Sequence, residues 1–149
     1  MRRFEFPLER ALDIRRLHRL LAEEKLGQAL RDESVVKSRL DTAREARVSL
    51  QREFRDAVTG RLDLRLLRRM LRHGESLENE IFRHTADLKM KREITRKARE
   101  AAIRRTQEER ALERYRENKL SEYIDAYWWD QAKKMDDIGA DRFLRSKER

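Results

Sequence analysis

The chain has 149 residues, of which 45% are charged, and its formal net charge at neutral pH is +9. An ordinary globular domain is far less charged, so this composition excludes a thick apolar core. There is no cysteine, which excludes a disulfide framework and a thiolate metal site. A single proline and four glycines leave almost nothing to interrupt a helix, so the composition favours a long helix or a coiled coil.

Intrinsic disorder is the competing interpretation, because high net charge with low hydropathy is typical of disordered chains. Disorder, however, would not require the regular apolar spacing described below. No apolar run reaches the roughly 18 residues that a transmembrane helix needs. The start of the chain has no apolar stretch typical of a secretory signal. We therefore expect a cytosolic protein whose basic charge favours acidic partners.

A first helix is expected over residues 7–57, because Pro7 suits a first helical turn and a regular stripe follows it. The stripe has alternating spacings of four and three residues and comprises Leu8, Leu12, Arg15, Arg19, Ala22, Leu26, Ala29, Glu33, Val36, Leu40, Ala43, Arg47, Leu50, Phe54 and Ala57. Such a heptad pattern predicts the seam of a coiled coil.

Four further apolar residues widen this face in the first third of the helix: Ile14, Leu17, Leu20 and Leu21. A two-stranded contact cannot cover so wide a face. We expect it either to pack against the C-terminal segment or to bind a partner.

A reversal of the chain is expected at residues 58–63. Gly60 can adopt a positive φ at the end of the first helix, and Asp63 can cap the start of the second. Because His73 and Gly74 weaken a helix, a longer connection out to residue 76 is the alternative, with Leu62–Arg72 as a short separate helix.

A second helix is expected to continue to about residue 138, with residues 139–149 frayed after Gly139. Its stripe comprises Leu67, Met70, Gly74, Leu77, Ile81, His84, Leu88, Lys91, Thr95, Ala98, Ala102, Arg105, Glu109 and Leu112. The fold class predicted for the single domain 1–149 is therefore all-α, a long antiparallel two-helix coiled-coil hairpin. By residue counting Leu8 faces Leu112, so the arms are unequal and the chain from Glu113 onward projects beyond the first helix.

No catalytic or metal-binding constellation is recognisable. His73 and His84 lie about three turns apart on a helix, too far to share one metal ion. No calcium loop, phosphate loop or zinc motif occurs, and two thin helices do not form a concave dry site. The expectation is a protein that is not an enzyme and has no cofactor, no metal and no small-molecule substrate.

Two stretches are candidates for binding. The basic run from Arg83 to Arg105 has the charge to neutralise nucleic-acid phosphates, but acids are interspersed and no aromatic side chain is available for base stacking. The second stretch, Tyr123–Trp129, has adjacent tryptophans that point about 100° apart on a helix. One of them could cover the widened face near Leu17, leaving the other for an interface; alternatively both pack within the chain.

The two ends together resemble the FliJ family of flagellar type III export proteins, which are related to the stalk proteins of virulence secretion systems. The resemblance lies in Phe4-x-Phe6-x-Leu8-x-x-x-Leu12-x-x-Arg15, in the long heptad hairpin, and in Met135-Asp136-Asp137-x-x-Ala140-x-Arg142-Phe143. Asp137 stands where the family usually has glutamate.

The resemblance implies a non-catalytic stalk at the cytoplasmic face of the inner membrane, at the flagellar base. Its partners would be the hexameric export ATPase, the cytoplasmic domain of the export gate and the export chaperones. The terminal end, residues 1–25 and about 120–145, would enter the ATPase ring, and the turn end would face the gate. The expected contacts with the ring are Leu8, Leu12, Leu17, Leu21, Trp128, Trp129, Asp137, Arg142 and Phe143.

Three alternatives stay open on the sequence. The same architecture would serve as the stalk of a virulence secretion system or of a rotary ATPase. A basic coiled coil that binds nucleic acid belongs to another class, as does a purely structural homodimer, because a second chain can satisfy an apolar seam as well as a hairpin can.

Overall fold

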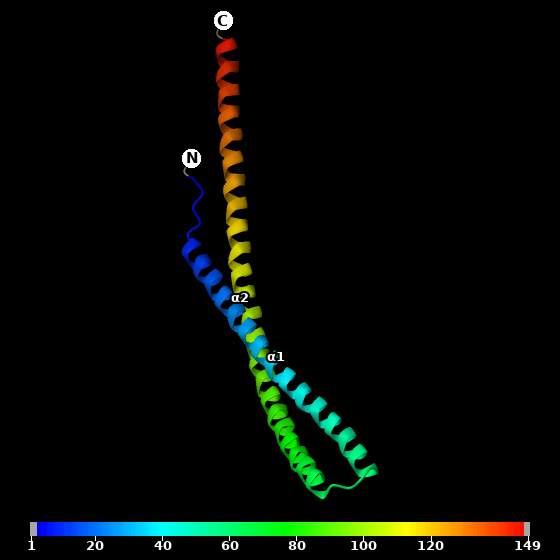
Figure 1. Cartoon of the computed structure of the whole chain (residues 1–149). Coiled ribbons are helices and arrows are strands. Elements are labelled where there is room, and N and C mark those ends of the chain that lie inside the picture. Colours follow the sequence, from blue (N-terminus) through cyan, green and yellow to red (C-terminus); the bar gives the residue numbers. More distant parts are fainter. Residues whose placement is uncertain (1–2, 148–149) are drawn as a thin grey trace. The chain divides into compact units, whose positions relative to one another are not determined.

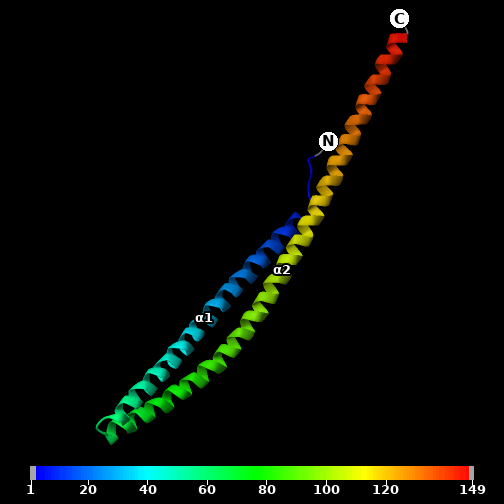
Figure 2. The same ribbon diagram turned by 90° about the vertical axis from the view of Figure 1, so that its right-hand side faces the viewer.

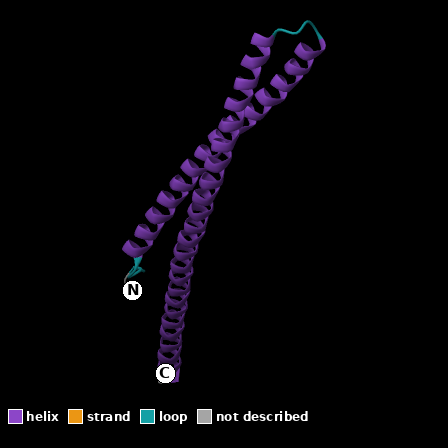
Figure 3. Ribbon diagram, turned by 90° about the horizontal axis from the view of Figure 1, so that it is seen from below, coloured by secondary structure: helices purple, strands orange, loops and turns teal. Residues whose placement is uncertain are grey.

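A computed structural model describes the backbone of residues 3–147 and the side chains of residues 3–138. It contains two helices, α1 (Glu9–Thr59) and α2 (Leu64–Lys147), which pack against each other (Figure 1). The described residues contain no strand (Figure 3). In the part of the chain that the structure describes, neither helix is apolar enough over a sufficient length to cross a membrane.

Contacts divide the chain into two units, which are described separately. The turn unit is Leu20–Ile103, and it contains the connection between the helices. The terminal unit consists of the residues up to Arg19 and those from Arg104 onward. Each unit therefore combines a stretch of α1 with a stretch of α2.

The entry into α1 is a tight turn. The backbone N–H of Glu9 donates to the carbonyl of Phe6 at 3.2 Å, which places Pro7 second in the turn, where its fixed φ is favourable. The helix thus begins at Glu9, two residues after the start expected from Pro7.

The connection between the helices consists of residues 60–63, within the range expected for the reversal. The expectation of a positive φ at Gly60 is wrong, since no described residue has one. The last turn of α1 is closed instead by Thr59, whose hydroxyl donates to the carbonyl of Asp56 at 3.0 Å. Four linking residues let the chain reverse without a left-handed residue.

The predicted cap at Asp63 is confirmed. Its Oδ1 accepts from the backbone N–H groups of Arg65 at 2.9 Å and Leu66 at 3.2 Å, which satisfies two of the free donors at the start of α2. From Leu64 the helix passes through Gly74 without interruption, so Leu62–Arg72 is not a separate helix. The backbone of α2 also continues beyond residue 138, to Lys147.

Burial follows the two predicted stripes. Every stripe residue from Leu12 to Ala57 on α1, and from Leu67 to Leu112 on α2, is buried or half-buried. Leu8 is the exception at 41% exposed, because it precedes the first helical residue. The seam therefore begins at Leu12, which is completely buried.

In the turn unit the seam has an apolar cluster and a polar stretch. The cluster consists of Val36, Leu40 and Leu88, with Ile81 packed against it. Beyond it, the ammonium of Lys91 lies 3.1 Å from Asp32, and the hydroxyl of Thr95 donates to the carbonyl of Ala29 at 3.3 Å. Polar side chains are tolerated in the seam because each of these has a partner across it.

Within each unit the cross-helix contacts run in reverse order. In the terminal unit Glu9 contacts Arg116 and Arg15 contacts Glu108. In the turn unit Lys91 contacts Asp32 and Arg47 contacts Glu78.

The position of Glu9 opposite Arg116 corrects the register expected from residue counting, in which Leu8 faces Leu112. The observed pairing is about one helical turn further along α2. The connection at residues 60–63 lies one residue later than the Thr59–Leu62 turn used in the count, which accounts for about two residues of this shift.

Replacing the cap residue, Asp63→Ala, is expected to lower the free energy of unfolding by about 1 kcal/mol, because two backbone N–H groups at the start of α2 lose their acceptor. Urea denaturation followed by circular dichroism measures the change. Asp41→Ala is the matched control, since Asp41 is exposed within α1. An equal loss in both variants would contradict a capping role.

Gly74→Ala is expected to stabilise the protein by about 0.5–1 kcal/mol, because alanine is the better helix former. A methyl group at Gly74 would lie 3.6 Å from Cδ2 of Leu50, an ordinary van der Waals distance, and so the buried seam accepts it. Gly27→Ala, also within a helix, is the comparison in the same denaturation assay. Stabilisation by Gly27→Ala together with destabilisation by Gly74→Ala would show that the seam needs glycine.

Candidate partner-binding surface of the terminal unit

Aromatic side chains hold the segment that precedes α1 against α2. The ring of Phe6 lies 5.9 Å from that of Tyr115, and the ring of Phe4 lies 5.5 Å from that of Tyr123. Figure 2 shows this segment, in dark blue, alongside α2. Phe6 is only 7% exposed, so the contact buries it almost as well as a core residue. Tyr115 and Tyr123 belong to the part of α2 expected to project beyond the first helix, and both contact the segment that precedes α1.

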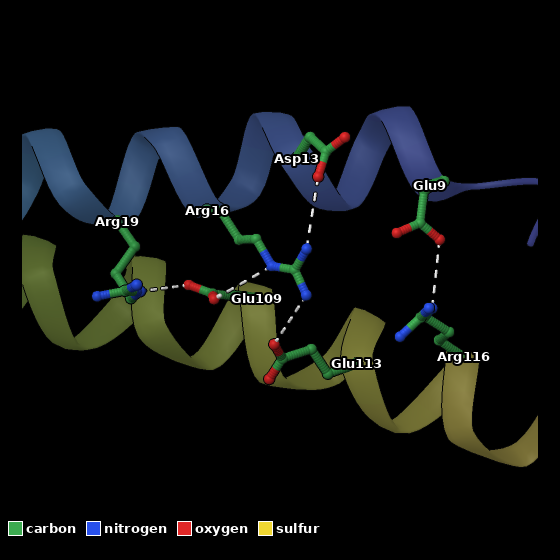
Figure 4. A network of polar contacts seen from close by, with 7 residues as sticks. All are labelled: Glu9, Asp13, Arg16, Arg19, Glu109, Glu113 and Arg116. Carbon is green, nitrogen blue, oxygen red and sulfur yellow. Dashed lines mark hydrogen bonds and ion pairs between the residues drawn. The ribbon is translucent and has the colours of Figure 1, made fainter.

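A network of charges links the two helices next to this aromatic contact (Figure 4). Glu109 lies in the seam, with its side chain 10% exposed, and it accepts from Arg19. Arg16 approaches Asp13 at 3.4 Å, Glu113 at 3.5 Å and Glu109 at 3.9 Å. A carboxylate that is nearly buried is costly unless cations compensate it, and here two arginines do so.

Glu108 extends the network on the neighbouring side of α2. Its carboxylate lies 2.9 Å from Arg105 and 2.6 Å from Arg15. The hydrogen bond from Arg105, followed by the charges of Arg105 and Arg15, lowers the pKa of Glu108 below its ordinary value. The carboxylate is therefore ionised at neutral pH, and it joins the helices through charge-assisted hydrogen bonds.

From Leu120 onward, α2 carries an apolar stripe whose side chains are exposed. We call it the terminal surface, and it consists of Leu120, Ile124, Tyr127, Trp128, Met135 and Ile138. Exposure ranges from 37% at Tyr127 to 70% at Met135. Their spacing places all six side chains within an arc of about 100° on the helix. Single exposed apolar residues are ordinary, whereas several exposed apolar side chains on one face of a helix indicate an interaction site.

Both tryptophans are exposed, Trp128 at 65% and Trp129 at 79%. Trp128 packs edge-on against Tyr127, with 5.6 Å between the rings, and so belongs to the terminal surface. Trp129 points about 100° away from it. The expectation that both pack within the chain is therefore wrong, as is the expectation that one covers the face near Leu17.

The widened face of α1 is also uncovered. Ile14 and Leu17 in the terminal unit are each 54% exposed, and in the turn unit Leu20 is 53% and Leu21 46% exposed. For Ile14 and Leu17, packing against the C-terminal segment, one of the two expectations for this face, is therefore wrong. The physical reason is that these side chains lie on the side of α1 away from the seam, which α2 occupies.

The other predicted contact residues differ in their accessibility. Leu12 is completely buried, so its side chain packs between the helices, while Leu8 is partly accessible and Asp137 is exposed. Arg142 and Phe143 lie outside the residues whose side chains are described. Leu120, Met135 and Ile138 were not predicted as contact residues, and Ile124 was predicted only as part of the stretch Tyr123–Trp129.

The basic run in the turn unit is partly neutralised. Arg96 lies 2.6 Å from both Glu93 and Glu100, and Arg92 lies 3.6 Å from Glu33 across the seam. Side chains held by carboxylates have less charge to offer to phosphates. This run therefore resembles a solvated helix face more than a nucleic-acid interface.

Comparison with protein-family models, with curated proteins and with solved structures finds no match for this chain. Among the described residues, no group of three or more acidic or histidine side chains is placed to hold a metal ion. The terminal surface is an apolar, partly aromatic stripe on α2, and the charge network around Glu109 joins the preceding part of α2 to α1.

Glu109→Gln is expected to lower the free energy of unfolding by about 1–3 kcal/mol, because Arg16 and Arg19 lose the charge that compensates them. Thermal and urea unfolding measure the loss. Glu117→Gln on an exposed part of α2 removes the same charge from a residue outside the seam, and it should leave stability nearly unchanged. Equal effects of the two variants would mean that net charge, and not the buried pairing, is responsible.

Proposed function

We propose that the protein is a non-catalytic stalk and coupling component of a flagellar type III export apparatus. In this proposal it is an antiparallel coiled-coil hairpin with unequal arms, similar to FliJ. Its terminal end binds in the ring of the hexameric export ATPase, promotes ring assembly, and links the ring to the export gate and to substrate chaperones. Its place would be the cytoplasmic face of the inner membrane, through these partners.

Two observations support the hairpin. The contacts between α1 and α2 run in reverse order in each unit. The buried residues of both helices follow spacings of three and four, which is the pattern of a coiled-coil seam. A stalk of this kind needs stiffness more than a thick core, and paired helices supply it.

The observation that carries the binding role is the exposed terminal surface. Aromatic residues such as Tyr127 and Trp128 are enriched among the side chains that dominate binding energies. Leu120 and Ile124 extend the apolar stripe on one side and Met135 on the other, giving a face suited to an apolar pocket of a partner. The chain's net charge of +9 would complement an acidic pore around it.

The same surface is compatible with the stalk of a virulence secretion system or of a rotary ATPase. Binding of nucleic acid is the alternative from another class, and the carboxylates that pair with Arg92 and Arg96 disfavour it. Salt-sensitive binding to DNA of random sequence, without any effect on an ATPase, would favour that alternative over a stalk.

The test is hydrolysis and ring formation by the export ATPase of the same organism, with and without the full-length protein. Wild type is expected to stimulate both. The variant Ile124→Ser/Trp128→Ala/Met135→Ser should weaken the apparent affinity for the ATPase by at least about 30-fold, since loss of one central aromatic contact alone can cost 2 kcal/mol or more.

Phe82→Ala is the matched control, because Phe82 is an exposed aromatic residue of the turn unit, at 76% exposure. Trp129→Ala, tested alone, decides whether the second tryptophan joins the contact. Folded, helical wild-type protein that leaves the ATPase unaffected would overturn the proposed role. Equal losses in the triple variant and in Phe82→Ala would overturn the assignment of the terminal surface.

A further inference from the structure

At the start of α2, arginines lie on one face of the helix and most leucines on the opposite face. Residues 60–74 contain five arginines, and Asp63 is the only acid among them. On α2, Arg65, Arg68, Arg69 and Arg72 fall within an arc of about 100°. The opposite arc has Leu66, Leu67, Met70, Leu71 and Gly74, part of which forms the seam. This start of α2 is a basic amphipathic helix.

These arginines differ from those elsewhere in the molecule. Arg61, Arg65, Arg68, Arg69 and Arg72 are all exposed, and none forms an ion pair with any residue that the structure describes. By contrast, many arginines along the rest of the helices contact a carboxylate, such as Arg47 with Glu78 and Arg92 with Glu33. The charge around the connection is therefore not neutralised within the protein.

Stability of the fold does not explain these arginines. The first turn of α2 has no acidic residue, and cations near a helix N-terminus interact unfavourably with the helix dipole. Asp63 already satisfies the backbone N–H groups of Arg65 and Leu66. The fold thus tolerates this positive charge. An external anion would reduce its unfavourable interaction with the helix dipole.

Leucines protrude beside the arginines. Leu62 is 63%, Leu64 68% and Leu71 56% exposed. Leu64 and Leu71 border the arginine arc next to Arg68, so apolar and basic side chains share one edge of the helix. We call Leu62, Leu64 and Leu71 together with Arg61, Arg65, Arg68 and Arg72 the turn-end surface.

We propose that the turn-end surface binds an anionic phospholipid membrane surface. The leucines enter the boundary between headgroups and acyl chains, and the arginines contact the phosphates. Arginines with exposed leucines beside them are the residue types that interfacial helices present to a membrane. Arginine can keep its guanidinium at the headgroups while its stem lies along the apolar layer. The inference does not depend on the proposed export function.

The side chains favour lipid over the other anionic partners. No Phe, Tyr or Trp lies between Phe54 and Phe82, so the surface lacks the large aromatic side chains on which nucleic-acid bases usually stack. Three strongly exposed leucines have no role on a phosphate backbone. An acidic protein would need a shaped pocket for each leucine, whereas a membrane accepts protruding apolar side chains without one.

The test is flotation of the full-length protein with vesicles. Vesicles of phosphatidylglycerol and phosphatidylcholine in equal parts are expected to bind it, and vesicles of phosphatidylcholine alone are not. Arg61→Gln/Arg65→Gln/Arg68→Gln should lower the partition coefficient on the order of 100-fold, from the contribution of each cation at an anionic surface. Leu62→Ser/Leu64→Ser/Leu71→Ser should lower it at least about tenfold.

Matched controls come from the same unit. Arg39→Gln/Arg44→Gln/Arg83→Gln removes the same charge from exposed arginines, and Leu30→Ser/Val35→Ser/Val48→Ser removes exposed apolar side chains. Both controls should retain nearly wild-type binding. Equal losses in a control and its test variant, or equal binding to both kinds of vesicle, would overturn the proposal. So would absence of vesicle binding combined with binding to random duplex DNA or to polyglutamate.

A fluorescence measurement distinguishes the turn-end surface from the exposed tryptophans of the terminal unit. In the variant Trp128→Phe/Trp129→Phe/Leu64→Trp, the single tryptophan reports on the start of α2. Anionic vesicles should shift its emission to shorter wavelength, and brominated acyl chains should quench it. Binding without either change would place the membrane contact elsewhere and overturn the inference.

Discussion

The contact between α1 and α2 is one stripe wide, and this constraint governs the rest of the molecule. A stripe with spacings of three and four can bury about one side chain per turn from each helix. In the turn unit, apolar residues such as Leu40 and Leu88 occupy these positions. Where the seam turns polar, Lys91 and Glu109 lie in it and each is compensated by a charge on the other helix. Nearly all large apolar side chains of the helices outside the stripe are exposed, since the described residues form no third layer to cover them.

The sequence allowed the seam to be predicted well, because burial in a two-helix contact depends on spacing alone. Leu12 and Leu50 are buried where the pattern places them, and Asp63 caps α2 as its position before the helix suggests. Details that depend on the register could not be predicted. Counting from an assumed turn placed the start of α1 about one helical turn from the level of the observed Glu9–Arg116 contact. The contacts of Phe4 and Phe6 with tyrosines of α2 could not be foreseen without the correct register.

The prediction for the candidate site failed in a different way. Two adjacent tryptophans suggested that one would be covered, because apolar surface in a globular protein is normally buried. In a molecule with a single seam, Trp128 and, on the far side of α1, Leu17 stay more than half exposed among the residues that the structure describes. The apolar spacing of the terminal surface, from Leu120 to Ile138, is present in the sequence. Spacing alone, however, is equally compatible with a buried continuation of the seam, and only the accessibility of the side chains shows that they form an exposed surface.

Arginine side chains have two distinct roles in this protein, and the presence or absence of a carboxylate partner distinguishes them. Arg19 and Arg15 contact carboxylates across the seam, so their charges fix one helix against the other. Arg65 and Arg68 have no such partner among the described residues and lie at a helix start that disfavours cations. In a chain so rich in arginine, composition cannot separate structural charges from those available for binding. The geometry separates them: where a cation has no carboxylate and exposed leucines lie beside it, an external anionic surface is the partner that accounts for both.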